Sequence, residues 1–496
     1  MTASHISVER TAHRLRPDPR RVIAKLFIPG QETLIDGESR AGSVIDRVLS
    51  LDDDQTASAL DEVLTLFGDR HPDLRALLLE HFSLVAHRID TAEDISIERQ
   101  LLVGACFTQE CAVEAASVCN PSMVSHPDQR NLAEGELRFV MSLRAIGEGH
   151  RSVIEFRTGV IGASGQVFID EPGTPILSAR PERVRYRRDL FHRVLEEMGE
   201  DRSSAAFVLD ALPDPFDDVE LEHALRALRD QVVTRGDAAK TIARIKGIAD
   251  ANYHVAFGAE SSISQRVLVP NTDSEVHGVE DARFVRFTND FGAGTYFATY
   301  TAYDGSHIAP RLLATDDFRT FESTQLTGRA SRNKGMALFP RRIGGRFVAL
   351  ARSDGENNSI VVSDDLTAWD EQTDLQRPHQ PWNLVQLGNC GSPIETADGW
   401  LMLTHGVGAM RRYVIAAELL DLDDPTRVIA QLPEPLLSPA DDERDGYVPN
   451  VVYSCGALLH GDHLVVPYGI GDANVGIARF SLSEILGRLD RSRIAV

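Results

Sequence analysis

The chain has 496 residues, 43% of them hydrophobic, so it is long enough for two or three structural units with separate cores. Its formal net charge is −23, from 51 Lys and Arg against 74 Asp and Glu, which argues against nucleic acid or an anionic membrane as its main partner. The five cysteines are odd in number and form no CxxC pair, which indicates neither a disulfide framework nor a zinc site.

The N-terminal segment carries no sign of export. Residues 1–21 are polar and rich in arginine, without the apolar core of a secretion signal. No run of eighteen apolar residues occurs in the sequence, so we expect no membrane-spanning segment. A cytoplasmic location is the expectation that follows.

The first part of the chain has mainly helical periodicity. One strand is expected at residues 22–28, after which Leu60, Val63, Leu64 and Phe67 form an apolar stripe at helical spacing. Residues 73–89 repeat this spacing, and residues 97–103 favour a third helix. We expect residues 1–110 to form a mostly helical unit that serves packing or self-association.

A strand pattern begins near residue 110 and recurs. Each copy has an apolar strand that ends in a basic or aromatic residue, then a polar loop and a second strand. The residues that end the first strand of the five copies are Arg144, Tyr303, Arg352, His405 and Tyr468. Short strands in repeats of about 40 to 50 residues are typical of propeller blades.

Two copies also share a turn sequence. Thr315-Asp316-Asp317 matches Ser363-Asp364-Asp365 at an offset of 48 residues. Aspartate favours turns because its side chain accepts hydrogen bonds from nearby backbone amides, so these aspartates are predicted to form turns and not to catalyse. We therefore predict a mainly β protein whose residues 111–185 and 253–496 form a five-bladed β-propeller.

Residues 186–252 interrupt the strand repeat with helical spacing. Leu190, Val194 and Leu195 form one apolar stripe, and Leu221, Leu225 and Leu228 form another. We interpret this segment as a helical insertion in one blade that packs on the N-terminal helices or on a second subunit. Two helical additions favour a homo-oligomer.

Acidic and basic residues mark a candidate site. Glu280, Asp281 and Arg283 stand where a strand emerges from a polar loop, a place where catalytic side chains are often displayed. A surface ion cluster is the alternative interpretation of these three residues. A propeller gathers equivalent positions around its axis, so Arg144, Arg352, His405 and the segment Arg332-Asn333-Lys334 are predicted to face an anionic ligand in an acidic chain.

In combination these motifs resemble glycoside hydrolase family 130, the β-mannoside phosphorylases and β-mannosidases, which are five-bladed propellers. The resemblance covers about residues 115–480 outside the helical insertion. It rests on Asn120-Pro121, Gly278-Val279-Glu280-Asp281-Ala282-Arg283, Arg332-Asn333-Lys334, Leu338-Phe339-Pro340, Arg352-Ser353, Gly399-Trp400-Leu401, His405-Gly406-Val407, Tyr413, Leu419-Leu420-Asp421, Tyr468-Gly469 and Asp472. The chain departs from the family at Ala282, where proline is usual, and in its larger helical additions.

The resemblance implies a role for each candidate residue. Asp281 would be the general acid, with its proton reaching the glycosidic oxygen through a hydroxyl of the bound mannose. Inorganic phosphate would be bound by Arg332, Arg352, His405 and Tyr413, with help from Lys334. The sugar would be bound by Asn120, Arg144, Glu280, Arg283, Tyr303 and Asp472.

These roles imply phosphorolysis of β-mannosides with inversion, which gives α-mannose 1-phosphate and a shortened acceptor. Phosphate brings its own negative charge, so the reaction needs clustered cations and no second protein carboxylate. Inorganic phosphate would be the co-substrate, and no metal or other cofactor is expected. β-1,2-linked mannosides are the favoured substrates. A hydrolytic β-mannosidase and a non-catalytic sugar-binding propeller are the alternatives.

Overall fold

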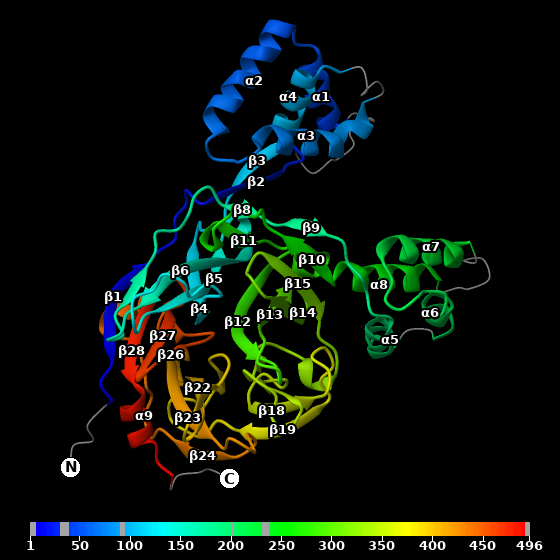
Figure 1. The fold of residues 1–496 in the computed structure, drawn as a ribbon. Helices are drawn as coiled ribbons and strands as arrows, with labels where there is room; N and C mark the ends of the chain where they lie inside the picture. The colour runs from blue at the N-terminus through cyan, green and yellow to red at the C-terminus, as the bar shows by residue number, and fades with distance from the viewer. Residues whose placement is uncertain (1–5, 30–38, 90–94, 200–201, 231–237, 492–496) are drawn as a thin grey trace. The chain divides into compact units, whose positions relative to one another are not determined.

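The computed structural model describes residues 6–29, 39–89, 95–199, 202–230 and 238–491, and it divides into two compact units. The helical unit comprises Asp18–Ala115 and Gly173–Leu177. The strand-rich unit comprises Met1–Pro17, Ala116–Pro172 and Ser178–Val496. The two units are coloured by residue number in Figure 1.

The helical unit contains four α-helices and a two-stranded sheet within its described residues. Its elements are β2 (Val22–Leu26), α1 (Arg40–Leu49), α2 (Asp53–Phe67), α3 (Leu74–Val85), α4 (Ile97–Cys106) and β3 (Thr108–Ala112). Leu60, Leu74, Leu78 and Leu101 pack together because the apolar stripes of three helices face one another. The three helices and the strand expected from the spacing are therefore present.

The strand-rich unit is mainly β, as predicted. Its strands before the helical insertion are β1 (Glu9–Leu15), β4 (Ser117–Ser125), β5 (Leu137–Ile146), β6 (Ser152–Ile161), β7 (Val167–Ile169), β8 (Leu177–Ser178) and β9 (Arg180–Glu182). The insertion follows with α5 (Arg188–Glu197), α6 (Arg202–Leu209), α7 (Asp218–Arg229) and α8 (Ala238–Asp250).

The strands after the insertion continue in short antiparallel runs. They are β10 (Tyr253–Ala256), β11 (Arg266–Leu268), β12 (Gly278–Thr288), β13 (Gly294–Tyr303), β14 (Ile308–Thr315), β15 (Thr320–Gln325), β16 (Ala337–Leu338), β17 (Phe347–Ala351), β18 (Asn358–Ser363) and β19 (Glu371–Gln376). The last are β20 (Gln386–Asn389), β21 (Ile394–Thr396), β22 (Gly399–Val407), β23 (Tyr413–Leu420), β24 (Val428–Gln431), β25 (Val452–Tyr453), β26 (Leu458–His460), β27 (His463–Ile470) and β28 (Asn474–Ser481), before helix α9 (Leu482–Arg488).

Four sheets organise the described strands of this unit. Strands β16 to β19 form one, β20 to β24 a second, and β25 to β28 with β1 a third. The fourth has twelve strands and consists of two antiparallel sets that are joined where Gly278 of β12 pairs in parallel with Ser152 of β6. In Figure 1 the sheets of this unit follow one another around a common centre.

All five predicted strand pairs are confirmed as antiparallel hairpins. They are β5–β6, β13–β14, β17–β18, β22–β23 and β27–β28. The shared turn is also explained, since Asp317 Oδ1 accepts from the amides of Arg319 and Thr320, while Asp365 Oδ1 accepts from that of Thr367. The second aspartate of each pair, Asp317 or Asp365, is therefore a turn former, as predicted.

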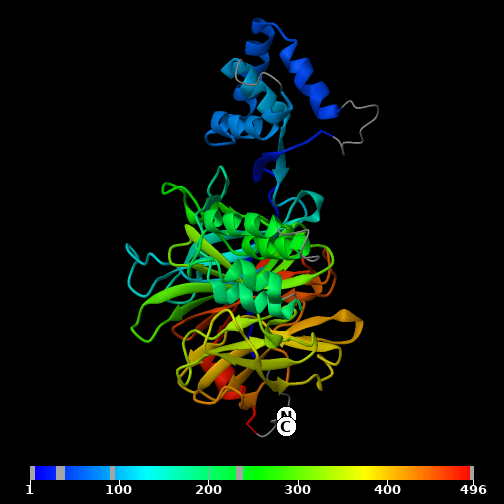
Figure 2. The same ribbon diagram turned by 90° about the vertical axis from the view of Figure 1, so that its right-hand side faces the viewer.

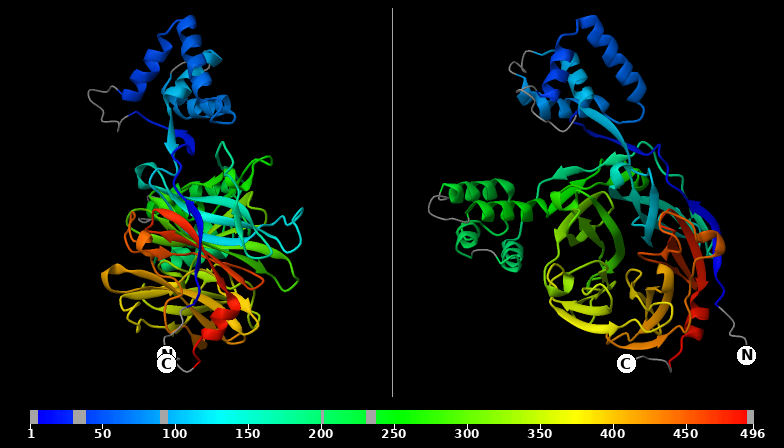
Figure 3. Two further views of the ribbon diagram at one scale, coloured as in Figure 1. Left: turned by 90° about the vertical axis from the view of Figure 1, so that its left-hand side faces the viewer. Right: turned by 180° about the vertical axis from the view of Figure 1, so that it is seen from behind.

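Strand β1 is a feature that the sequence did not predict. It pairs antiparallel with β28, from Glu9 opposite Arg479 to Leu15 opposite Val475. Figure 3 shows this N-terminal strand beside the C-terminal strands. The first strand of the chain therefore completes the sheet that contains the last one.

The carboxylate of Glu443 fastens β1 to its surroundings. Its side chain is only 1% exposed and accepts from Arg10 Nε at 3.3 Å and from Arg14 Nη2 at 3.2 Å. The buried hydroxyl of Tyr468 also donates to it. Tyr468 therefore faces this ion cluster, although its place in the repeat predicted a side chain directed to the axis.

The helical insertion is framed by β9 and β10, which pair with each other, and β10 pairs with β15. Its four helices bury a core of their own that includes Phe191, Leu225 and Ile245, and Figure 2 shows them packed together. Glu197 Oε1 accepts from the amide of Gly328 at 2.6 Å, which ties the insertion to the strands. None of the described helices of the protein is long and apolar enough to span a membrane.

Replacing Glu443 with alanine is expected to lower the free energy of unfolding of the strand-rich unit by about 2–3 kcal/mol, because it leaves a buried hydroxyl and two arginines without their acceptor. Urea denaturation measures this change. The control is Glu371→Ala, which removes the exposed pair of Glu371 with Arg346 and should cost less than about 1 kcal/mol. Equal losses in the two variants would contradict the stabilising role of Glu443.

Candidate active site

Most of the predicted site residues meet in one polar cavity of about 210 Å³ in the strand-rich unit. The residues that line it are Asn120, Arg144, Asp281, Lys334, Arg352, Gln386, His405, Arg411, Tyr413, Val448, Val451, Tyr453 and Asp472. They come from segments spread over more than 350 positions of the chain, and the sheets bring them together. The predicted convergence of Asp281 with basic residues of the repeat is therefore present for Arg144, Arg352 and His405.

Two bulges direct the central side chains into the cavity. The pairing register shifts in β12 between Glu280 and Arg283, and in β4 between Cys119 and Ser122. Within these bulges Asp281 has a φ of 58° and Asn120 a φ of 49°. Asp and Asn enter this left-handed region more readily than other side-chain residues, and a bulge re-aims the side chain that it holds. Asn120 Nδ2 consequently donates to Asp281 Oδ1 at 2.5 Å.

A second carboxylate, Glu280, is held by two cations. Arg144 Nη2 lies 2.5 Å from its Oε1 and Lys334 Nζ lies 2.5 Å from its Oε2. Arg144 Nη1 also lies 3.7 Å from Asp281 Oδ1. Because both oxygens of Glu280 are engaged, this residue positions Arg144 and Lys334 beside Asp281.

The charges around Asp281 determine its protonation. Burial alone would raise the pKa of this carboxyl, but Arg144, Arg283 and Lys334, with the Asn120 hydrogen bond, outweigh burial and hold the pKa below its ordinary value. Asp472 behaves in the opposite way, because burial and the negative charge of Asp281 raise its pKa to about 6. The cavity therefore contains one ionised carboxylate and one that titrates near neutrality.

His405 is neutral and has a defined tautomer. Burial and the charge of Arg352 lower the pKa of its imidazole well below the ordinary value. Its Nδ1 lies 3.1 Å from the carbonyl oxygen of Asn389, so Nδ1 carries the hydrogen. Its Nε2 lies 3.4 Å from Arg352 Nη1 and acts as the acceptor. The ring also stacks on Tyr413, with the centroids 6.0 Å apart.

Buried Arg283 contacts both the bulge of Asp281 and the lining residue Tyr453. Arg283 Nη1 donates to the carbonyl oxygen of Asp281 at 3.1 Å, and its Nη2 donates to Tyr453 Oη at 2.7 Å. The Tyr453 ring lies 4.8 Å from that of His405. Arg283 therefore supports the backbone of the bulge and places a third cation near the carboxylate of Asp281.

Four predicted residues do not line the cavity, namely Arg332, Tyr303, Glu280 and Arg283. Arg332 is exposed on the loop before Lys334, and Tyr303 directs its hydroxyl to the carbonyl oxygen of Gly305 at 2.8 Å. Tyr303 is predicted to line a common pocket from its position in the repeat, and Arg332 as part of the segment Arg332-Asn333-Lys334. Glu280 and Arg283 act from behind the lining residues.

The structure adds lining residues that the sequence did not single out. They are Gln386, Arg411, Val448, Val451 and Tyr453. Gln386 Nε2 lies 3.4 Å from Tyr413 Oη, which extends the polar group around His405. Tyr453 and Gln386 stand in short strands with no repeated motif, so no sequence signal marked them. Among the described residues, no group of three or more His, Cys, Asp and Glu side chains is placed to hold a metal ion.

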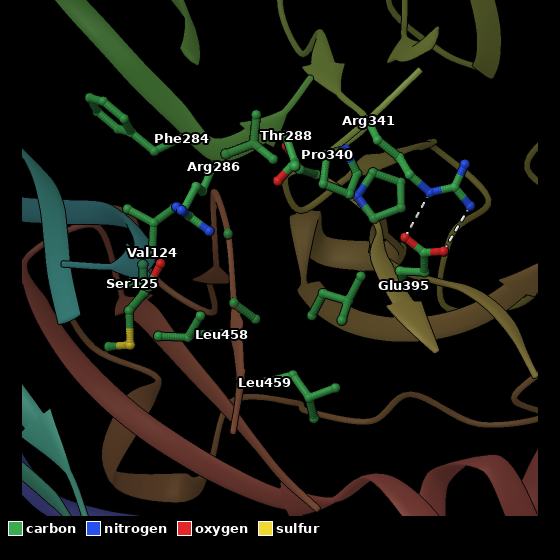
Figure 4. A pocket seen from close by; sticks show the side chains of 17 residues that line it. Val124, Ser125, Phe284, Arg286, Thr288, Pro340, Arg341, Glu395, Leu458 and Leu459 are labelled. Atoms are coloured by element: carbon green, nitrogen blue, oxygen red, sulfur yellow. Dashed lines mark hydrogen bonds and ion pairs between the residues drawn. The ribbon is translucent and has the colours of Figure 1, made fainter. Parts of the chain in front are cut away.

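A larger cavity, of about 550 Å³, lies further along β4 and β12, the strands that carry Asn120 and Asp281. β4 contributes Met123 to Ser125 and β12 contributes Phe284 to Thr288, so this cavity follows the active-site residues along both strands. Figure 4 shows its leucine and proline side chains and the ion pair of Arg341 with Glu395. Because it has no cluster of opposing charges comparable with that around Asp281, we assign the chemistry to the smaller cavity.

Comparison with known proteins identifies relatives of the chain. A family model described as beta-1,4-mannooligosaccharide phosphorylase, Glyco_hydro_130, matches residues 245–491. A beta-1,2-mannobiose phosphorylase of Listeria innocua is 34% identical over 231 residues, which are 45% of this chain and 63% of that protein. A 1,2-beta-oligomannan phosphorylase of Thermoanaerobacter sp. is 32% identical over 227 residues, which are 45% of this chain and 75% of that protein.

A solved structure, the Listeria innocua beta-1,2-mannobiose phosphorylase with beta-1,2-mannobiose, matches with a TM-score of 0.43 and 23% identity. The match covers 76% of this chain and 93% of that one. The segment matched by the family model includes Asp281, Arg352 and His405 and ends before the C-terminus, while Asn120 and Arg144 precede it.

Asp472→Asn is expected to stabilise the protein at pH 8 and to have little effect below about pH 4. The folded pKa of Asp472, about 6, exceeds the unfolded value of about 3.9, so its contribution to stability is complete below pH 4 and is lost as the pH rises through 6. The gain at pH 8 should be at most about 3 kcal/mol by urea denaturation. The exposed Asp290→Asn is the control, and a gain that does not depend on pH would contradict the assignment.

Proposed function

The chain belongs to glycoside hydrolase family 130, and from this premise we propose that it is a β-mannoside phosphorylase. It would cleave the bond between C1 of a β-linked mannose and the acceptor oxygen, and form a bond between C1 and a phosphate oxygen. The products are α-mannose 1-phosphate and a shortened acceptor. The observation that carries the proposal is that Arg352, His405 and Tyr413 line the same small cavity as Asp281.

Phosphate would bind between Arg352, His405 and Tyr413. The guanidinium of Arg352 supplies charge and paired donors for phosphate oxygens. Nε2 of neutral His405 accepts from Arg352 and would accept instead from a protonated phosphate oxygen once Arg352 binds the anion. An unprotonated phosphate oxygen would then attack C1. Lys334 would add positive charge from its place beside Glu280.

Asp281 would supply the proton for the departing acceptor oxygen. In the cavity without phosphate its pKa is low because of Arg144, Arg283 and Lys334. A bound phosphate adds negative charge to the same cavity, which offsets these cations and raises the affinity of Asp281 for a proton. Asp281 would therefore be protonated when phosphate, the nucleophile, is bound. A mannose hydroxyl would carry this proton to the glycosidic oxygen.

The carboxylates near Asp281 include only one candidate, Asp472, for the base that hydrolysis by water would need. An inverting hydrolase needs a second carboxylate as a base that activates water. Glu280 is unsuited because both of its oxygens bind cations. Asp472 is the remaining candidate, and its pKa of about 6 is the observation that supports a hydrolytic β-mannosidase as the second candidate function.

The mannose ring would lie between Asn120, Arg144 and Asp472, with Glu280 and Arg283 supporting them. We favour β-1,2-linked substrates, since the two relatives described above are named as phosphorylases of β-1,2-linked mannosides, although the family model is described by β-1,4 linkages. Inorganic phosphate is the co-substrate in this proposal. The sheets around the cavity would be the five blades of a propeller, with the twelve-stranded sheet supplying two of them.

The protein is expected to release mannose 1-phosphate from β-1,2-mannobiose only when phosphate is present, and Asp281→Asn should lower the rate by at least about 100-fold. Enzymatic assay of mannose 1-phosphate and of free mannose measures both reactions. Asp364→Asn, at an exposed turn, is the matched control. Free mannose released at the same rate without phosphate would identify a hydrolase and refute the proposal.

Arg352→Ala is expected to raise the KM for phosphate at least tenfold, because it removes the charge beside His405 that would meet the anion. The KM for the mannoside should change much less. Initial rates over a grid of both substrates separate the two effects, with Arg346→Ala, in an exposed ion pair, as the control. A change confined to the mannoside KM would place phosphate elsewhere in the cavity.

A further inference from the structure

Two hairpin tips of the strand-rich unit have the same backbone. The β5–β6 tip runs from Gly147 to Arg151 and the β22–β23 tip from Gly408 to Arg412. Gly147 has φ and ψ of −98° and −163°, and Gly408 has −102° and −162°. In each tip the glycine amide donates to the carbonyl oxygen four residues later, at 2.9 Å and 3.0 Å. The two tips also occupy equivalent places in the chain, because each begins three residues after a residue that lines the cavity, Arg144 or His405.

The tips differ in the side chains that occupy their left-handed positions. The first tip has Gly149 and His150, with φ values of 73° and 57°. The second has Met410 and Arg411, with φ values of 57° and 54°. Glycine relieves this strain in the first tip, whereas the second holds two consecutive side chains in it. Met410 is 91% exposed, so burial of its side chain does not account for the choice.

Arg411 is the residue of this tip that lines the cavity. Within the described part of the chain its guanidinium forms no hydrogen bond or ion pair, whereas Arg144 and Lys334 are paired with Glu280. Its charge acts on Asp472 and lowers the pKa of that carboxyl against the larger effect of burial. An arginine with all its donors available therefore stands at the cavity edge.

The surroundings of the tip fix its position. The amide of Tyr413 donates to the carbonyl oxygen of Asn450 at 3.0 Å, and that of Val448 donates to the carbonyl oxygen of Gly471 at 2.7 Å. The segment from 448 to 450 thus connects the end of the tip to the turn that carries Asp472. These backbone hydrogen bonds therefore connect the segments that carry Arg411 and Asp472, and both residues line the cavity.

We propose that Arg411 binds an anionic oxygen group at the edge of the active-site cavity. The group is either inorganic phosphate or a carboxylate or phosphate carried by the acceptor sugar. This inference rests on the proposed phosphorylase function and adds to it a residue that recognises an anion. The reason is physical: a chain of charge −23 repels anions, and an unpaired guanidinium on the cavity wall gives them a local site.

Arg411→Gln, compared with Arg412→Gln, tests the proposal in three measurements. Calorimetric titration with inorganic phosphate measures binding without turnover. Initial rates give the KM for phosphate. Synthesis from mannose 1-phosphate with glucose or with glucuronic acid as acceptor measures the preference for an acidic acceptor. Arg412 is exposed and does not line the cavity, so its variant should behave as the wild type.

If the anion is phosphate, Arg411→Gln should weaken phosphate binding and raise its KM at least fivefold, and Arg411→Lys should recover part of the loss. If the anion belongs to the acceptor, the wild type should prefer glucuronic acid to glucose at least fivefold and Arg411→Gln should lose this preference. Unchanged phosphate binding together with no acidic preference would overturn the inference. Failure of the wild type to form mannose 1-phosphate would instead overturn the proposed function, and calorimetry would still test Arg411.

Met410→Gly tests whether the tip is strained. The variant should raise the midpoint temperature of unfolding, because glycine adopts this conformation without strain. Gly149→Ala in the equivalent tip should lower it, although no atom lies within 4 Å of the added methyl group. Opposite shifts in the two tips would support the strain, and a lower midpoint for Met410→Gly would refute it.

Discussion

A buried carboxylate needs compensating charge, and this requirement governs the site. Asp281 is shielded from water, so its ionised form exists only because Arg144, Arg283 and Lys334 surround it and Asn120 donates to it. These cations need positions of their own, which Glu280 and Tyr453 provide. The cavity is therefore a network in which each charge orients another, and removing one member changes the protonation of the rest.

The backbone contributes as much as the charges. Asp281 and Asn120 meet because each stands in a bulge with left-handed φ, and regular strands would direct neighbouring side chains alternately to opposite faces. Left-handed positions are costly for most side chains but less so for Asp and Asn. The residue types present at these two positions, Asp and Asn, are thus also those that the bulges tolerate.

The sequence predicted those parts of the molecule that depend on periodicity and composition. The five hairpins and the convergence of Arg144, Arg352 and His405 follow from a repeated pattern of apolar strand and terminal basic residue. Tyr303 and Tyr468 share that pattern, yet one bonds to Gly305 and the other to Glu443, because pattern does not specify side-chain direction. Strand β1 escaped prediction because polar residues such as Arg10 and Arg14 predominate in it, and its pairing with β28 joins opposite ends of the chain.

The pKa values of the two acids of the cavity are shifted in opposite directions because their surroundings differ. Asp281 lies among three cations, which hold its pKa below the ordinary value and keep it ionised. Burial and the negative charge of Asp281 raise the pKa of Asp472 to about 6. An anion that enters beside Arg352 adds to this negative field and therefore favours protonation of both carboxyls. In the proposed reaction, this arrangement would couple the binding of phosphate to the proton affinity of Asp281. A neutral His405 serves the same end, since it leaves Arg352 as the cation that the entering anion meets.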